Sequence, residues 1–66
     1  MDSHTLRLFL SLADNLHFGK TSRELHVSPS ALSRSIKQLE DELGAPLFLR
    51  DNRSVRLTRE GQQFRE

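Results

Sequence analysis

The sequence contains no cysteine and no long apolar run. Without cysteine there are no disulfides and no thiolate metal ligands, so a small fold must be held together by apolar packing, which suits a reducing cytoplasm. No run approaches the roughly 20 apolar residues that span a bilayer. The N-terminal MDSHTLRLFL also lacks a positively charged region ahead of its leucines. We therefore expect neither a membrane protein nor a secreted precursor.

Patterns that carry out catalysis are missing as well. His4, His17 and His26 are too widely spaced for a compact metal motif. Ser28 lies close to His26 in sequence, but no carboxylate is placed to orient the imidazole, and there is no glycine-rich oxyanion or phosphate loop. A chain of 66 residues forms one small domain with little room for a substrate cavity. We expect that the chain is not an enzyme and that it binds no metal or cofactor.

Charge is distributed unevenly, although the net charge is only +1. Residues 20–37 contain four basic residues and one acidic residue, and so do residues 50–59. Between them the charged residues are all acidic: Glu40, Asp41 and Glu42. Two basic segments around an acidic one can form a basic face that binds a polyanion. The alternative is a mixed solvated surface, on which the acidic residues are solubilising or pair with nearby basic side chains.

Apolar residues at helical spacing predict a first helix over about residues 3–15, with Asp2 or Ser3 as its N-cap. We expect its main buried stripe to consist of Leu6, Phe9, Leu10, Ala13 and Leu16. Leu8 and Leu12 widen this apolar surface, which suggests more than one packing partner, such as a second copy of the chain.

A short second helix, a tight turn and a third helix follow. The second helix is expected over about residues 18–25. Ser28 has the residue type of an N-cap and Pro29 that of the first helical position, while Gly44 supplies a stop. The third helix is therefore expected over residues 29–43.

The third helix has two distinct faces. On a helical wheel one stripe is apolar and is expected to be buried: Leu32, Ile36, Leu39 and Leu43. The opposite side carries Ser30, Ser33, Arg34, Lys37 and Asp41. Ser28 and Ser30 could merely cap the helix and fill its first turn. Arg34 and Lys37 could merely solvate it. Ser33 is harder to explain in this way, because serine is mildly unfavourable inside a helix.

Two short extended runs, residues 47–50 and 55–58, predict a small β-hairpin around a turn rich in Asp, Asn and Ser. Arg53 at the tip of this turn is either a flexible solvated charge or a finger for the narrow minor groove of DNA. The second and third helices with a hairpin behind them describe a mainly α fold, the winged helix-turn-helix.

After the hairpin, Thr58 has the residue type to cap a final helix, with Phe64 as its inward residue. Gly61 is expected to weaken that helix by about 1 kcal/mol relative to alanine. We expect this helix to be cut off at Glu66, so that the chain is part of something longer.

A winged helix-turn-helix typically recognises duplex DNA. Its recognition helix fits the major groove, where small side chains let the backbone approach the base edges and hydroxyl or guanidinium groups form hydrogen bonds. The alternative is a winged helix used as a protein–protein interaction module, in which the outward face of the third helix meets a partner protein.

The motifs LHVS, ALSR, LEDELGAPLF with Arg50 close behind, and LTREG follow one another along the chain. Over nearly its whole length the chain resembles, without a gap, the N-terminal DNA-binding domain of LysR-type transcriptional regulators. The segments HFGK, HVSPS and RDNRSVRLT are, more narrowly, similar to the IlvY branch, whose members activate branched-chain amino acid biosynthesis.

The resemblance implies sequence-specific binding of double-stranded DNA. Residues 1–58 would form the winged helix-turn-helix, and residues 59–66 would start a truncated linker helix that mediates dimerisation. The recognition helix, residues 29–43, would lie in the major groove, and the wing, residues 50–55, near the minor groove. The expected DNA contacts are Lys20, Thr21, Ser28, Pro29, Ser30, Ser33, Arg34, Lys37, Arg50 and Arg53.

The resemblance also implies properties of a longer parent protein. Its missing C-terminal domain would bind a small-molecule coinducer, and the parent would form a homodimer or tetramer. RNA polymerase is a further candidate partner. The expected location is the bacterial cytoplasm, in association with the nucleoid.

The chain departs from the common family pattern at two places. Many members have Gln-Pro where this chain has Pro29-Ser30, so an amide able to read adenine is absent and base choice should differ. Many also have two alanines where this chain has Thr21-Ser22. Because Ser22 lies on the packed face, we expect its hydroxyl to bond back to a helix carbonyl.

Overall fold

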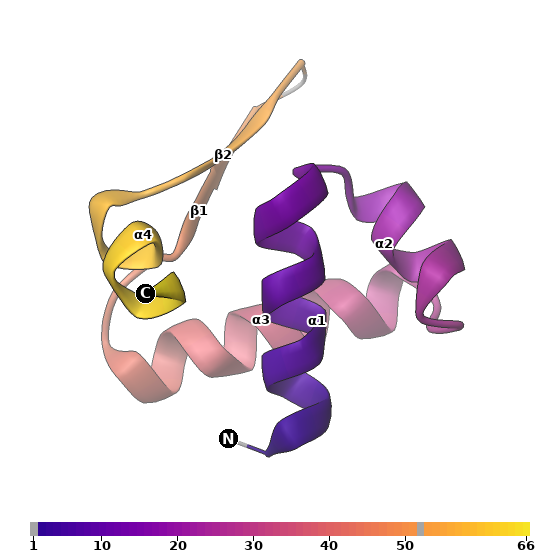
Figure 1. Ribbon diagram of the computed structural model, residues 1–66, viewed down its shortest axis with the longest axis horizontal. Helices are drawn as coiled ribbons and strands as arrows, with labels where there is room; N and C mark the ends of the chain where they lie inside the picture. The colour runs from indigo at the N-terminus through magenta and orange to yellow at the C-terminus, as the bar shows by residue number, and fades with distance from the viewer. Residues whose placement is uncertain (1, 52) are drawn as a thin grey trace.

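The computed structural model describes residues 2–51 and 53–66 as four helices and a two-stranded antiparallel sheet (Figure 1). In chain order the elements are α1 (Ser3–Asn15), α2 (Phe18–Glu24), α3 (Pro29–Leu43), β1 (Phe48–Arg50), β2 (Val55–Leu57) and α4 (Arg59–Arg65). This arrangement confirms the predicted winged helix-turn-helix, with the hairpin as its wing. Asn52, part of the predicted wing, lies outside the described residues.

The helix boundaries follow local signals in the sequence. Asp2 caps α1 and Ser28 caps α3, each through a side-chain oxygen that accepts the N–H three residues later, at 2.8 and 3.1 Å. Gly44 ends α3 in the left-handed conformation, with φ of 77°, which glycine adopts at least cost. Both helices therefore have their predicted bounds. α2 ends one residue earlier than predicted, at Glu24, because Leu25 forms its C-cap.

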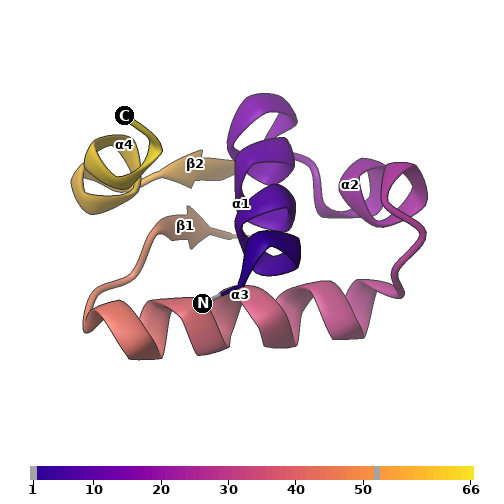
Figure 2. The same ribbon diagram turned by 60° about the horizontal axis from the view of Figure 1, so that its bottom comes forward.

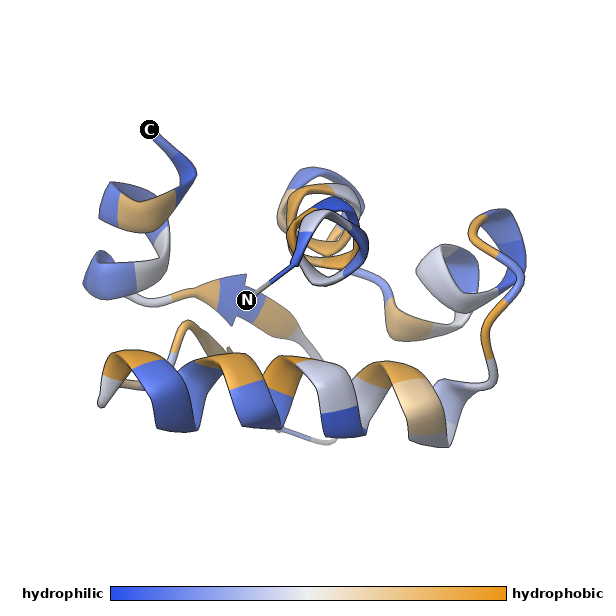
Figure 3. Ribbon diagram, turned by 90° about the horizontal axis from the view of Figure 1, so that it is seen from below, coloured by the Kyte–Doolittle hydropathy of each residue, from blue (hydrophilic) through white to orange (hydrophobic). Residues whose placement is uncertain are grey.

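α1 crosses α3, and their contact forms the centre of the core (Figure 2). The apolar side of α3 faces α1 and the hairpin, and its polar side faces away (Figure 3). The buried apolar side chains are Leu8, Phe9, Leu12, Ala13, Leu32, Ile36, Leu39, Leu47 and Phe48. Phe9 links three elements, because its ring centroid lies 5.5 Å from that of Phe48 and 5.0 Å from that of Phe64. The inward position predicted for Phe64 is thereby confirmed.

The buried side of α1 differs from the predicted stripe. Leu8 and Leu12 complete the core beside Phe9 and Ala13. Three predicted core residues are exposed instead: Leu6, Leu10 and Leu16. Leu16 also lies outside the helix, as its left-handed C-cap. Because α1 is apolar around much of its circumference, its periodicity does not select one side, and the positions of α3 and the wing decide.

Leu43 is a second correction to the predicted core. Leu32, Ile36 and Leu39 of the same stripe are buried as predicted, but Leu43 is 45% exposed. It is the last residue of α3 and lies beyond the part of the helix that α1 crosses (Figure 2). The stripe is therefore longer than the surface available to cover it.

The hairpin is attached to the helices at its root. Its register pairs Phe48 with Leu57, Leu49 with Arg56 and Arg50 with Val55. The backbone N–H of Thr58 donates to the carbonyl of Leu47 at 3.0 Å, and its hydroxyl donates to the carbonyl of Pro46 at 2.7 Å. The same hydroxyl oxygen accepts the N–H of Gly61 at 2.9 Å. Thr58 therefore closes the hairpin and caps α4, the cap being as predicted.

Gly61 is required by packing, which the sequence did not indicate. A β-carbon at this position would overlap the carbonyl oxygen of Leu47 and would lie 2.8 Å from Cδ2 of Leu57. Glycine thus lets α4 approach the root of the wing. The cost of about 1 kcal/mol expected for glycine considers helix propensity alone and takes no account of this close contact.

Replacing Gly61 by alanine should destabilise the fold by up to about 2 kcal/mol, since overpacking costs about 1–3 kcal/mol and the gain in helix propensity offsets about 1 kcal/mol of this. Urea denaturation followed by circular dichroism measures the change. Gln63→Ala is the matched control, because Gln63 is exposed on the same helix and its replacement should change stability by less than about 0.5 kcal/mol. A higher denaturation midpoint for Gly61→Ala would contradict the close contact.

Candidate nucleic-acid interface

The first turn of α3 is open to solvent and rich in hydroxyl groups. Ser28, Pro29 and Ser30 are all exposed. The Oγ of Ser28 accepts the N–H of Ala31 at 3.1 Å and lies 3.4 Å from the Oγ of Ser30. The capping role of Ser28 is confirmed. Its hydroxyl is exposed while it caps, so it can also bond a group outside the protein.

Beyond this turn the polar face of α3 points away from the core (Figure 3). Arg34 and Lys37 are exposed, and Ser33 is half-buried. Ser33 and Lys37 line a small recess together with Phe18 of α2 and Arg50 of β1. A side chain as short as serine at this point lets another molecule come close to the helix backbone.

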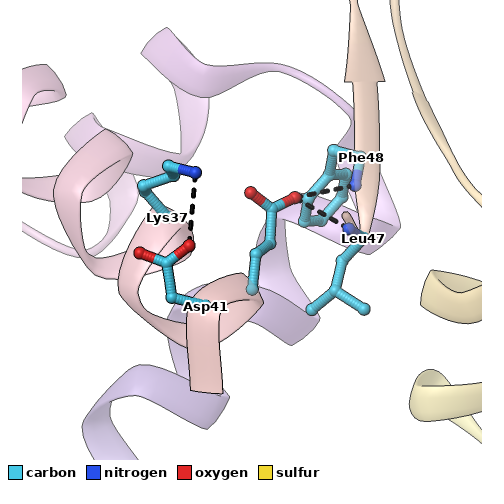
Figure 4. Close-up of polar contacts among 5 residues, drawn as sticks. Lys37, Asp41, Leu47 and Phe48 are labelled. Atoms are coloured by element: carbon cyan, nitrogen blue, oxygen red, sulfur yellow. Dashed lines mark hydrogen bonds and ion pairs between the residues drawn. The ribbon is translucent and has the colours of Figure 1, made fainter. Parts of the chain in front are cut away.

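Lys37 forms an ion pair that the charge pattern had left open. Its Nζ lies 3.2 Å from Oδ1 of Asp41, one turn further along α3 (Figure 4). Both side chains are well exposed, at 71% and 66%. An exposed pair at this spacing contributes only about 0.3–0.5 kcal/mol. Lys37 can therefore exchange Asp41 for a stronger anionic partner.

Arg50 reaches from β1 across the start of α2. Its guanidinium carbon lies 4.4 Å from the centroid of the Phe18 ring, a cation–π contact. Lys20, two residues after Phe18, is exposed. The N–H of Lys20 donates to Nδ1 of His17 at 3.0 Å, which caps α2. Arg50 thus brings a cationic side chain against the start of α2, the helix on which Lys20 is also exposed.

Thr21 does not belong to this surface, contrary to the expectation from the sequence. Its side chain is completely buried, and its hydroxyl donates to Oδ1 of Asn15 at 3.1 Å. Ser22 is also buried and donates to the carbonyl of Gly19 at 2.9 Å, as predicted. Both hydroxyls are therefore used inside the helix-turn-helix, where they satisfy buried polar groups.

Asp51 organises the tip of the wing. Its Oδ1 accepts the N–H of Arg53 at 2.8 Å and that of Ser54 at 2.9 Å, and its own N–H donates to the carbonyl of Ser54 at 3.0 Å. The hydrogen bonds from Arg53 and then Ser54 lower the pKa of the Asp51 carboxyl. Arg53 is held by its backbone while its side chain remains exposed.

These parts of the molecule adjoin one another. Arg50 lines both the recess beside Ser33 and a second groove that runs between the wing and the start of α2, which Arg53 also lines. The end of the hairpin emerges on the side toward which the polar face of α3 points (Figure 3). We use the name basic surface for the residues predicted to contact DNA other than Thr21: Lys20, Ser28, Pro29, Ser30, Ser33, Arg34, Lys37, Arg50 and Arg53.

Glu40 has a contact that the sequence did not predict. Its Oε2 accepts the backbone N–H of Leu47 at 2.7 Å and that of Phe48 at 3.2 Å (Figure 4). The charge pattern had suggested a solubilising residue or a partner for a basic side chain. No local signal could have shown otherwise, because the two donors come from the backbone after the chain has folded back at Gly44.

Within residues 2–51 and 53–66 no helix has the length and apolar character needed to cross a bilayer. The same residues contain no group of three or more acidic or histidine side chains that could hold a metal ion.

Comparison with known proteins identifies related sequences over nearly the whole chain. The model of the family described as bacterial regulatory helix-turn-helix protein, lysR family, matches residues 3–62. The chain is 55% identical over 65 residues to the HTH-type transcriptional activator IlvY of Salmonella typhimurium, which covers 98% of this chain and 22% of that protein. The chain therefore spans about a fifth of the length of this relative.

Similar solved structures include complexes with DNA. A complex of the BenM DBD with catB site 1 DNA is 37% identical, with a TM-score of 0.92, and the match covers 98% of this chain and 73% of that one. DarR of Vibrio fischeri in complex with DNA is also 37% identical, with a TM-score of 0.91, over 98% of this chain and 22% of that one.

The Asp51 carboxyl should titrate below the ordinary aspartate value of 3.8. Because its pKa is lowered in the folded state, the hydrogen bonds at the wing tip are fully formed above the ordinary value and are lost as the pH falls through the folded one. An NMR titration should give one shared midpoint for the Asp51 carboxyl carbon and the amides of Arg53 and Ser54. The urea-unfolded protein is the control and should show the ordinary value. A folded midpoint at or above 3.8 would contradict this hydrogen bonding.

Proposed function

We propose that this chain, which belongs to the LysR family of bacterial regulatory helix-turn-helix proteins, binds double-stranded DNA in a sequence-specific manner. The observation that supports this most directly is the exposed basic surface on α3 and the wing, in a fold that two relatives present to DNA. In this proposal α3, residues 29–43, enters the major groove and the wing, residues 50–55, lies near the minor groove.

The outward face of α3 is the proposed reader of base edges. Pro29, Ser30 and Ser33 are short, so the helix backbone can come close to the floor of the groove. Arg34 is exposed and can donate two hydrogen bonds to one guanine. Lys37 would leave its weak pair with Asp41 for a phosphate or a base at the edge of the site.

Phosphate contacts would fix the register of the helix on the duplex. The first turn of α3 offers backbone N–H groups, the positive end of the helix dipole and the exposed hydroxyl of Ser28. Lys20 and Arg50 lie beside this helix on α2 and β1 and would meet the sugar–phosphate backbone. Arg53 at the wing tip would enter the minor groove, whose negative potential attracts arginine.

The similarity to IlvY supports a proposal for the whole protein. We propose that it regulates genes of branched-chain amino acid biosynthesis. Residues 1–58 would be its DNA-binding domain and residues 59–66 the start of a linker helix. The rest of the protein would bind a small-molecule coinducer and form a dimer or tetramer. The whole protein would be located in the bacterial cytoplasm in association with the nucleoid, and RNA polymerase would be a further partner. The alternative, a winged helix for protein contact, receives no support from the comparisons.

Affinity for duplex DNA should fall steeply as salt is raised. Each phosphate neutralised by a basic side chain lowers the logarithm of the affinity by about 0.9 per unit of log salt. Fluorescence anisotropy with the protein at its natural length and a duplex selected from random sequence measures this slope. Lys20→Ala should make the slope shallower by about 1. Duplex binding that is undetectable at low salt would exclude the proposed function.

Replacing Arg34 by alanine should weaken binding to the selected duplex by about 1–3 kcal/mol and leave the melting temperature nearly unchanged, because its side chain is exposed. Leu39→Ala gives the opposite pattern, since a cavity at this fully buried position costs about 2–5 kcal/mol of stability. Binding to selected and scrambled duplexes is compared for each variant. If Arg34→Ala distinguished the selected duplex from the scrambled one as well as the parent does, Arg34 would not read bases.

A further inference from the structure

Glu40 connects the recognition helix to the wing through a single oxygen. Its side chain is half-buried on α3, the helix that also carries the exposed pair of Lys37 and Asp41, and it reaches the start of the hairpin. The Oε2 atom receives two successive backbone N–H groups, those of Leu47 and Phe48. Both donors belong to buried residues, and a buried N–H group requires an acceptor.

A second contact holds the wing further along its length. Arg50, at the end of β1, rests on the ring of Phe18. Beside the packing of Phe48 on Phe9, two further attachments hold the hairpin: a carboxylate from α3 at its root and an aromatic ring from α2 at the end of its first strand. Loss of the first would remove the hydrogen bonds that fix the root on α3, so the root could shift against this helix, and the tip with Arg53 would move with it.

On the premise of the DNA-binding function proposed above, we propose that Glu40 is a positioning residue. It touches no DNA itself but sets the wing at the place where Arg53 and the face of α3 meet one duplex together. The contact is well suited to this task because its acceptor lies on the recognition helix and its donors belong to the backbone at the root of the hairpin.

If Glu40 acted on DNA binding only through its charge, its removal would change the affinity in the opposite direction. A carboxylate near the basic surface repels phosphates, so its removal by itself should raise affinity for DNA. Loss of positioning should lower affinity instead. Asp41 provides the matched control, because it is the next residue and also acidic, but its carboxylate pairs with the side chain of Lys37.

The test compares Glu40→Ala, Glu40→Gln and Asp41→Ala with the parent at natural length, on a duplex selected from random sequence. Glutamine keeps an oxygen acceptor without the charge. Glu40→Ala should lower affinity by about tenfold, comparable with the loss of one arginine contact. Glu40→Gln should stay within about threefold of the parent's affinity, and Asp41→Ala should bind as tightly as the parent or more tightly.

In an Arg53→Ala background, Glu40→Ala should lower the affinity by less than about twofold, because both changes remove the same wing contact.

The role of Glu40 is overturned if Glu40→Ala binds as tightly as the parent, if alanine and glutamine cause equal losses, or if the effects of Glu40→Ala and Arg53→Ala are additive. Failure of the parent itself to bind duplex would refute the proposed function, a different result. Independently of DNA, the amide NMR signals of Leu47 and Phe48 should move further in Glu40→Ala, which removes the acceptor, than in Glu40→Gln, which keeps a neutral one. If Glu40→Ala does not fold, Glu40→Asp replaces it. That variant keeps the charge but draws the acceptor back by one methylene group, and it should also lower affinity.

Discussion

The burial of Phe9 is the contact on which the other parts of the structure depend. Its side chain is completely buried, and the rings of Phe48 and Phe64 pack against it. Burying one such side chain contributes about 1.5–3 kcal/mol, and each aromatic pair adds about 0.5–1.5 kcal/mol. In a small domain, whose total stability is about 5–15 kcal/mol, these rings have a large effect. They join α1 to the wing and to α4, so the wing is part of the core rather than an appendage.

Features that depend on neighbours in the sequence were predicted correctly. Ser28 and Gly44 bound α3 because a cap needs only a suitable side chain or backbone conformation at one position. The buried stripe of α3 was also predicted except for Leu43 at its end, since the apolar residues occupy one narrow side. The buried side of α1 could not be predicted in this way. It offers two overlapping apolar stripes, and only the placement of its partners makes Leu8 and Leu12 buried.

The candidate site was predictable to a similar extent. A helical wheel and family positions identified exposed residues such as Arg34, but a pattern of residue types does not distinguish an exposed hydroxyl from one used internally, as Thr21 shows. Glu40 and Gly61 were interpreted wrongly or incompletely for a related reason. The role of each residue depends on a contact with backbone atoms of Leu47 or its neighbours, which come close only after the chain has turned at the end of α3. Contacts with backbone atoms that are distant in the sequence cannot be predicted from residue types.

The stacking of Arg50 on Phe18 has a consequence for the thermodynamics of binding. A free arginine side chain loses about 2 kcal/mol of rotamer entropy when it is immobilised. Here the ring already restrains the guanidinium in the folded protein, so much of that loss occurs during folding and not when a ligand arrives. Arg50 is thus preorganised to donate hydrogen bonds, with a smaller entropic penalty than an unsupported arginine would incur.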